Sequence, residues 1–99
     1  MRVIISPRAE ADLLEIDHHI ALDSPRSADR QIQQLQLACM SLGDGPLRFA
    51  IVRNRNGVEV RRAVRGSYSI FYVVRGEEVY VARILHSSRD FRKFFGEDD

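Results

Sequence analysis

The sequence predicts an α+β fold in which an antiparallel helical hairpin packs on an antiparallel sheet of three or four strands, in the order β-α-α-β-β-β. Two observations predict it. Before Pro46 the apolar residues recur every three or four positions, as on a helix, and after Pro46 they recur every second position, as on a strand. The alternating segments are separated by short turns containing glycine, which are typical of antiparallel hairpins. The 99 residues suffice for one core, so we expect a single domain over residues 1–99.

The first strand and the first helix are predicted from the start of the chain. Residues 3–5 are apolar and predict a strand. Ser6 and Pro7 predict the start of a helix, because serine can accept hydrogen bonds from free N–H groups and proline lacks the N–H that would be unpaired there. An apolar stripe follows: Ala9, Leu13, Ile16 and Ile20. We expect this helix to end near Asp23.

A second helix is predicted by the same start signal, Ser24-Pro25. Its apolar stripe is Ala28, Ile32, Leu35, Cys39 and Leu42, and Gly43 and Gly45 end it. Two amphipathic helices joined by so few residues fold back on each other, with both stripes on one core. Cys39, the only cysteine, is therefore expected to be a buried core thiol.

The second half of the chain predicts the sheet. Residues 49–53 are a candidate strand, followed by a turn at residues 54–57. Three further strands are expected over residues 58–65, 68–75 and 79–85, joined by turns at Gly66-Ser67 and Gly76-Glu77. This meander places residues 68–75 in the middle. Phe91, Phe94 and Phe95 have helical spacing and predict a short turn that packs on the sheet.

The net charge of +1 hides an asymmetry along the chain. Residues 1–46 carry four arginines against seven acidic residues, whereas residues 47–95 carry ten arginines and one lysine against four. The last residues, Glu97, Asp98 and Asp99, are acidic. Arginine makes forked contacts with anions, so the basic half predicts a binding face for an acidic protein surface or a phosphate backbone. The alternative is a solvated sheet edge on which arginine prevents aggregation.

Several classes of function find no support in the sequence. No apolar segment is long enough to span a bilayer and no leader precedes the first strand, so we expect a cytoplasmic protein without a membrane partner. His18 and His19 are neighbours on the predicted helix and point about 100° apart, so they do not form a pair of metal ligands. The sequence also has no glycine-rich phosphate loop. We therefore expect no cofactor and no metal.

Four segments resemble the ParE/RelE toxin superfamily, and ParE toxins in particular. Residues 6–13, Ser-Pro-Arg-Ala-Glu-Ala-Asp-Leu, are similar to the first helix of ParE toxins, and Asp23-Ser24-Pro25 to their turn into the second helix. The strongest matches are Gly-Ser-Tyr-Ser-Ile-Phe-Tyr at residues 66–72 and residues 81–90, which resemble the family's closing strand and its His-x-x-Arg-Asp ending. The matches follow one another in order over nearly the whole chain.

The resemblance implies a bacterial toxin with the hairpin-on-sheet fold, neutralised by a cognate ParD-like antitoxin whose C-terminal segment wraps the toxin. ParE toxins act on DNA gyrase, which they inhibit by binding, so direct nucleic-acid binding is not expected. Two alternatives remain. The RelE branch of the superfamily cuts messenger RNA in the ribosome, and a relic would bind its antitoxin without being toxic.

A ribonuclease needs a base for the 2′-hydroxyl proton, an acid for the leaving oxygen and cations for the phosphate. The chain offers Arg62, Tyr68, Arg83 and His86 for these roles. Arg62 falls where RNA-cutting members keep a basic residue, but three departures count against the ribonuclease. Ser69 stands where RNA-cutting members carry arginine, and Ser87 and Ser88 stand where they carry a basic residue. Near the end of the chain, where those members tend to have a tyrosine, the aromatic residues are Phe91, Phe94 and Phe95, which cannot donate or accept a proton.

For a binding toxin, the candidate residues are basic: Arg61, Arg62, Arg65, Arg83, Arg89, Arg92 and Lys93. Arg62 and Arg83 lie on strand faces otherwise filled by aliphatic residues, so either their stems cover the edge of the core or they bind a partner. His86 is expected to hydrogen-bond the turn that follows the last strand. The antitoxin is expected on exposed apolar rims around Leu14, Ile51, Val52 and the terminal phenylalanines.

Overall fold

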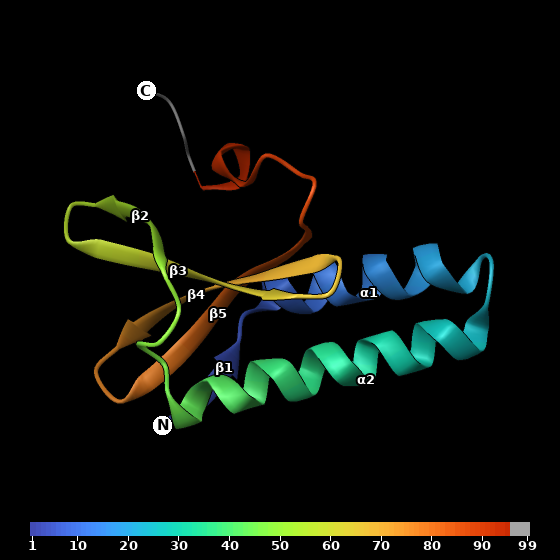
Figure 1. The fold of residues 1–99 in the computed structure, drawn as a ribbon, viewed down its shortest axis with the longest axis horizontal. Helices are drawn as coiled ribbons and strands as arrows, with labels where there is room; N and C mark the ends of the chain where they lie inside the picture. Colours follow the sequence, from blue (N-terminus) through green and yellow to red (C-terminus); the bar gives the residue numbers. More distant parts are fainter. Residues whose placement is uncertain (96–99) are drawn as a thin grey trace.

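The computed structural model describes residues 1–95, which form two helices, five strands and two short 3-10 turns. In chain order these are β1 (Arg2–Ile5), α1 (Pro7–Ala21), α2 (Pro25–Ser41), η1 (Leu42–Asp44), β2 (Ile51–Arg55), β3 (Val58–Arg65), β4 (Tyr68–Arg75), β5 (Glu78–His86) and η2 (Phe91–Phe94). The helical hairpin and η2 lie on opposite sides of the sheet (Figure 1). The expected α+β class is confirmed.

The sheet has more strands than the three or four expected, and it is mixed rather than wholly antiparallel. Its order is β1-β5-β4-β3-β2. The predicted meander is present, with β4 between β3 and β5. β1 adds a parallel edge strand, since Arg2–Ile5 lie beside the start of β5, and the helical hairpin then carries the chain across the sheet to β2. β2 forms the other edge, antiparallel to β3.

Local signals set the ends of these elements. The Ser6 hydroxyl accepts a hydrogen bond from the Ala9 N–H at 3.0 Å, and the Ser24 hydroxyl accepts one from the Ser27 N–H at 3.2 Å, as predicted for helix caps. β2 continues to Arg55, past the expected strand end, because Asn56 and Gly57 alone make the turn. Both have positive φ, 55° and 83°, as a two-residue hairpin turn requires.

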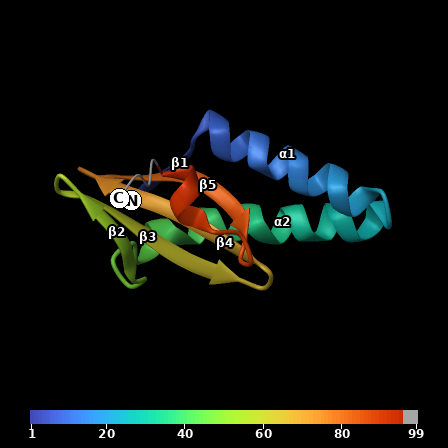
Figure 2. The ribbon, with the colours of Figure 1, turned by 90° about the horizontal axis from the view of Figure 1, so that it is seen from above.

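One core lies between the helices and the sheet, and it contains the predicted apolar stripes of both helices except Ile20 and Ala28. Its fully buried members include Ala9, Leu35, Cys39, Leu42, Ala63, Ile70, Tyr72, Val79 and Val81. Burial, with the nearby carboxylate of Glu10, raises the pKa of the Cys39 thiol to about 12, so this cysteine stays protonated as a core residue. The free end of the hairpin extends beyond the sheet (Figure 2). None of the helices in the described residues is long and apolar enough to cross a membrane.

A second, smaller cluster covers the opposite face of the sheet, which we call the outer face. Val60, Phe71 and Leu85 are buried there under the end of the chain. The residues that cover them include Phe91, Phe94 and Phe95. The Phe91 ring stacks on the Phe71 ring with the centres 5.1 Å apart. The prediction that the terminal phenylalanines fold a short turn onto the sheet is confirmed.

Candidate functional site

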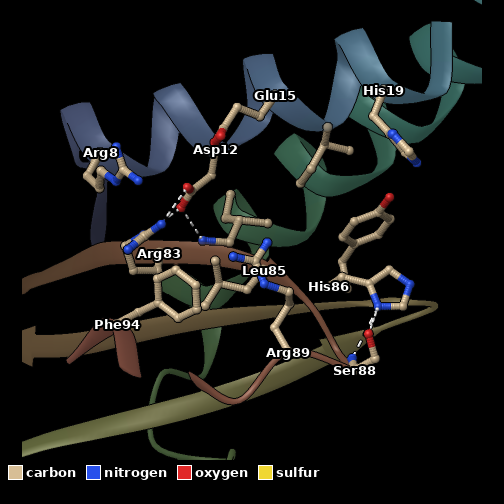
Figure 3. Close-up of a pocket in the computed structure, with 13 residues that line it drawn as sticks. Arg8, Asp12, Glu15, His19, Arg83, Leu85, His86, Ser88, Arg89 and Phe94 are labelled. Carbon is tan, nitrogen blue, oxygen red and sulfur yellow. Dashed lines mark hydrogen bonds and ion pairs between the residues drawn. The ribbon is translucent and has the colours of Figure 1, made fainter. Parts of the chain in front are cut away.

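A pocket of about 460 Å³ lies between α1 and the second half of β5 (Figure 3). It exists because β1 ends at Ile5 and pairs only as far as Val81, so the later part of β5 has a helix rather than a strand beside it. Polar side chains line much of the pocket: Arg8, Glu15, His19, Tyr68, His86, Ser88 and Arg89. Its apolar part is made by Ile16, Ile84, Leu85 and Phe94.

A buried ion pair joins the two walls of this pocket. The carboxylate of Asp12, which is 3% exposed, accepts hydrogen bonds from Nε and Nη2 of Arg83, each at 2.9 Å. It also accepts one from the backbone N–H of Ile84 at 2.9 Å. Figure 3 shows the Arg83 guanidinium between Asp12 and the Phe94 ring, whose centre is 4.7 Å away. The charge of Arg83 is therefore neutralised within the fold.

A β-bulge determines where Arg83 points. Phe71 lies opposite Arg83 and Tyr72 lies opposite Val81, so Ala82 is an extra residue in β5. Sequence reasoning singled out Arg83 but missed Asp12. A signal was present, because Asp12 follows Ala9 by three residues and precedes Ile16 by four, which puts a carboxylate on the buried stripe of its helix.

Tyr68 and His86 meet at one end of the pocket, with ring centres 5.4 Å apart in an edge-to-face arrangement. Burial raises the pKa of the Tyr68 hydroxyl above its ordinary value. Nδ1 of His86 accepts a hydrogen bond from the Ser88 N–H at 3.1 Å and lies 2.8 Å from the Ser88 hydroxyl. His86 therefore organises the turn after β5, as expected.

Arg62 lies on the outer face of the sheet, away from this pocket. Its Nε donates to the Ser69 hydroxyl at 2.9 Å, and its guanidinium carbon lies 5.7 Å from the centre of the Phe71 ring and 5.8 Å from that of Phe91. Tyr68 packs instead on the core that faces the helices. The four ribonuclease candidates are thus divided: Tyr68, Arg83 and His86 line the pocket and Arg62 does not.

The remaining basic candidates have varied surroundings. Nη1 of Arg61 donates to the carbonyls of Leu47 and Phe49, at 3.0 Å and 2.7 Å, and so holds the segment before β2. Arg65 stacks on Phe49, with its guanidinium carbon 5.1 Å from the centre of the ring. Arg92 forms an ion pair with Asp90 at 3.1 Å, and its hydrogen bond lowers the pKa of that exposed carboxyl.

Arg89 and Lys93 are exposed at the end of the described chain. The guanidinium carbon of Arg89 lies 4.8 Å from the centre of the Phe94 ring, and Figure 3 shows Arg89 near the turn that contains Ser88. Within residues 1–95, no three His, Cys, Asp or Glu side chains gather as metal ligands would. The site is therefore a set of cations and aromatic rings around a pocket.

The expected apolar rims do not form one surface. Leu14 is 71% exposed and lines a separate groove between α1 and α2, together with Ile32. Ile51, on the edge strand β2, is 42% exposed. Val52 is half-buried and packs on the outer-face cluster of Val60, Phe71 and Leu85 instead.

The comparison with known families settles the relationship that the sequence suggested. Residues 3–91 match the family described as the ParE toxin of the type II toxin–antitoxin system parDE. The chain belongs to the ParE toxin family. A solved structure described as a chromosomal ParDE toxin–antitoxin system from P. aeruginosa is similar to it, with 25% identity and a TM-score of 0.70. The match covers 87% of this chain and 95% of that one. No curated protein matches.

The segments that carried the resemblance to ParE toxins lie side by side in the fold. Residues 66–72 lead into and begin β4, and residues 81–90 form the second half of β5 and the turn after it. Tyr68 pairs directly with His86 across these two strands. The part of this ParE family member with the strongest resemblance therefore lines the pocket.

Proposed function

We propose that this ParE family member is a cytoplasmic toxin that inhibits DNA gyrase by binding it, and that a ParD-like antitoxin neutralises it by wrapping it with a C-terminal segment. Membership of the ParE family supports the proposal that the protein is a toxin and that an antitoxin binds it. The described name of the similar structure, a ParDE system, supports a partner of the ParD kind. One observation favours binding over RNA cleavage. The candidate catalytic residues do not lie together around one site.

Cleavage through a 2′-hydroxyl needs cations and proton carriers around one phosphate. Here Arg62 and Tyr68 belong to opposite faces of the sheet. The fork of Arg83 is occupied by Asp12, so its charge does not act on a phosphate. Burial raises the pKa of Tyr68, so less of its phenolate, the form that could accept a proton, is present near neutral pH. This arrangement favours a toxin that acts by binding.

The gyrase contact is proposed on the exposed cations of the C-terminal segment, Arg89 and Lys93. The stacking of Arg89 on Phe94 limits the entropy that its side chain loses on binding. Electrostatic attraction between this surface and an acidic surface of the target would favour encounter. Arg92 is a weaker candidate because Asp90 already pairs with it.

Titration of purified DNA gyrase with the protein tests this contact. Replacing Arg89 and Lys93 together by alanine is expected to weaken binding by about tenfold or more. The matched control replaces Arg26 and Arg30, two exposed arginines of α2, and removes the same charge elsewhere. Equal affinity of the two double variants would contradict the proposed contact. An absence of gyrase binding by the unaltered protein would contradict the proposed function itself.

A further inference from the structure

Arg62 is held in a fixed orientation on the outer face of the sheet. Its Nε donates to the hydroxyl of Ser69, a fully buried residue, and that hydroxyl lies 3.0 Å from the hydroxyl of Ser87. The rings of Phe71 and Phe91 lie 5.7 Å and 5.8 Å from the guanidinium carbon. These contacts order a long side chain before any partner arrives.

The fork formed by Nη1 and Nη2 of Arg62 has no hydrogen-bond or ion-pair partner among residues 1–95, although the residue is half-buried. Arg83 differs, since its Nε and Nη2 bind Asp12. Arg61 differs as well, since its Nη1 binds two backbone carbonyls. A partly desolvated cation without an anion is unfavourable, so this geometry suits a negative group that comes from another molecule.

The surroundings of Arg62 indicate which negative group fits. Val60 and Val64 are two residues away on β3 and therefore share the face of Arg62, and Val64 is 50% exposed. A carboxylate can accept two parallel hydrogen bonds from the Nη1/Nη2 fork. A nucleic-acid backbone carries successive phosphates and is bound by several cations close together, whereas the side chains in contact with Arg62 are Ser69, Phe71 and Phe91, none of which is a cation. One acidic side chain flanked by apolar ones is the better match.

We propose that Arg62 binds an aspartate or glutamate side chain of the antitoxin segment, with apolar neighbours of that residue packed on Val64 and Phe91. This inference rests on the proposed function, since it assumes that an antitoxin wraps the toxin. Ser69 acts as a positioning residue, because its hydroxyl binds Nε and so fixes the side chain while Nη1 and Nη2 stay free.

The test is calorimetric titration of the full chain with the antitoxin encoded by the adjoining gene. Arg62→Ala is expected to weaken binding by about 10- to 100-fold, since a forked, charged contact is lost. Arg62→Lys is expected to weaken it nearly as much, because lysine keeps the charge but has no fork. Ser69→Ala is expected to have a smaller effect. The matched control is Arg75→Ala, an exposed arginine 4.2 Å from the Tyr80 ring, with an expected change of about twofold or less.

Three results would contradict the inference, and one of them would also contradict the proposed function. Wild-type affinity in both Arg62 variants would overturn the inference and leave the proposed function standing. If the unaltered protein forms no complex with the antitoxin, the proposed function fails and the inference fails with it. Loss of RNA binding with unchanged antitoxin binding would assign Arg62 to a phosphate and overturn the proposal. Thermal melting monitors the fold, and Arg62→Lys gives the answer if Arg62→Ala does not fold.

Discussion

Asp12 and Arg83 show how a single pair of side chains can fix both the fold and the site. The Asp12 carboxylate binds the two nitrogens of the Arg83 fork and one backbone N–H, so α1 is held against β5 by three hydrogen bonds. Both side chains are largely buried, with exposed fractions of 3% and 11%. Removing one partner leaves the other charge buried without compensation, which is strongly unfavourable.

Asp12→Ala should therefore lower the free energy of unfolding by about 3–5 kcal/mol. The matched control is Glu15→Ala, which removes an exposed acidic residue one turn along α1 and should change it by about 0.5 kcal/mol or less. Urea unfolding of the two variants checks the difference. Equal losses of stability would contradict the structural role of the ion pair.

Cys39 makes stability depend on pH in the alkaline range. Its pKa is raised from the ordinary 9.0 to about 12 by burial, followed by the charge of Glu10. The folded state thus holds a proton that the unfolded state releases, so the contribution of this thiol is fully present below pH 9.0 and is lost as the pH rises toward 12.

Wild-type protein should lose more stability than Cys39→Ala between about pH 8 and about pH 10.5. The variant is the internal control, because titration of the other groups is common to both proteins. Urea unfolding at the two pH values measures the difference. A parallel decline of the two proteins would mean that Cys39 does not ionise on unfolding in this range.

For the individual elements, short signals predicted the helix starts and the three-stranded meander well, but the bounds of β2 and the long-range pairing poorly. Ser6-Pro7 and Ser24-Pro25 fixed the two helix starts because capping involves only neighbouring residues. The pairing of β1 with β5 joins residues that are far apart in the sequence, and no local sequence pattern predicts it. The bulge at Ala82 is also absent from the sequence pattern. Counting from the Gly76-Glu77 turn puts Arg83 opposite Ile70, whereas the bulge puts it opposite Phe71, on the other face.

The two helix caps should differ in strength. Ser6 is buried and its hydroxyl also donates to the Ala82 carbonyl at 3.1 Å, so Ser6→Ala should lower the free energy of unfolding by about 2 kcal/mol. Ser24→Ala removes only a cap and should lower it by about 1 kcal/mol. Ser27→Ala, an exposed serine in the first turn of α2, should change it by about 0.5 kcal/mol or less. Urea unfolding checks this order, and a larger loss for Ser24→Ala than for Ser6→Ala would contradict it.

At the scale of the whole molecule, the candidate residues were identified from the sequence more readily than their arrangement. The sequence was sufficient to predict that Arg62 and Tyr68 lie on opposite faces of the sheet. A two-residue turn at Gly66-Ser67 pairs Arg65 with Tyr68, so these two share a face and Arg62, three residues before Arg65, lies on the other. The pocket was not predictable in this way, because it depends on the packing of α1 beside an unpaired part of β5.

For the whole molecule, we propose that it acts by binding gyrase rather than by cutting RNA. Plasmid supercoiling by purified DNA gyrase, with the protein added, tests this most directly when ribosome-dependent RNA cleavage is measured beside it. We expect inhibited supercoiling or trapped cleaved DNA, reversal by the antitoxin, and uncut messenger RNA. Unaffected gyrase together with messenger RNA cut in the ribosome would contradict it and would make Tyr68 and His86 the first residues to replace.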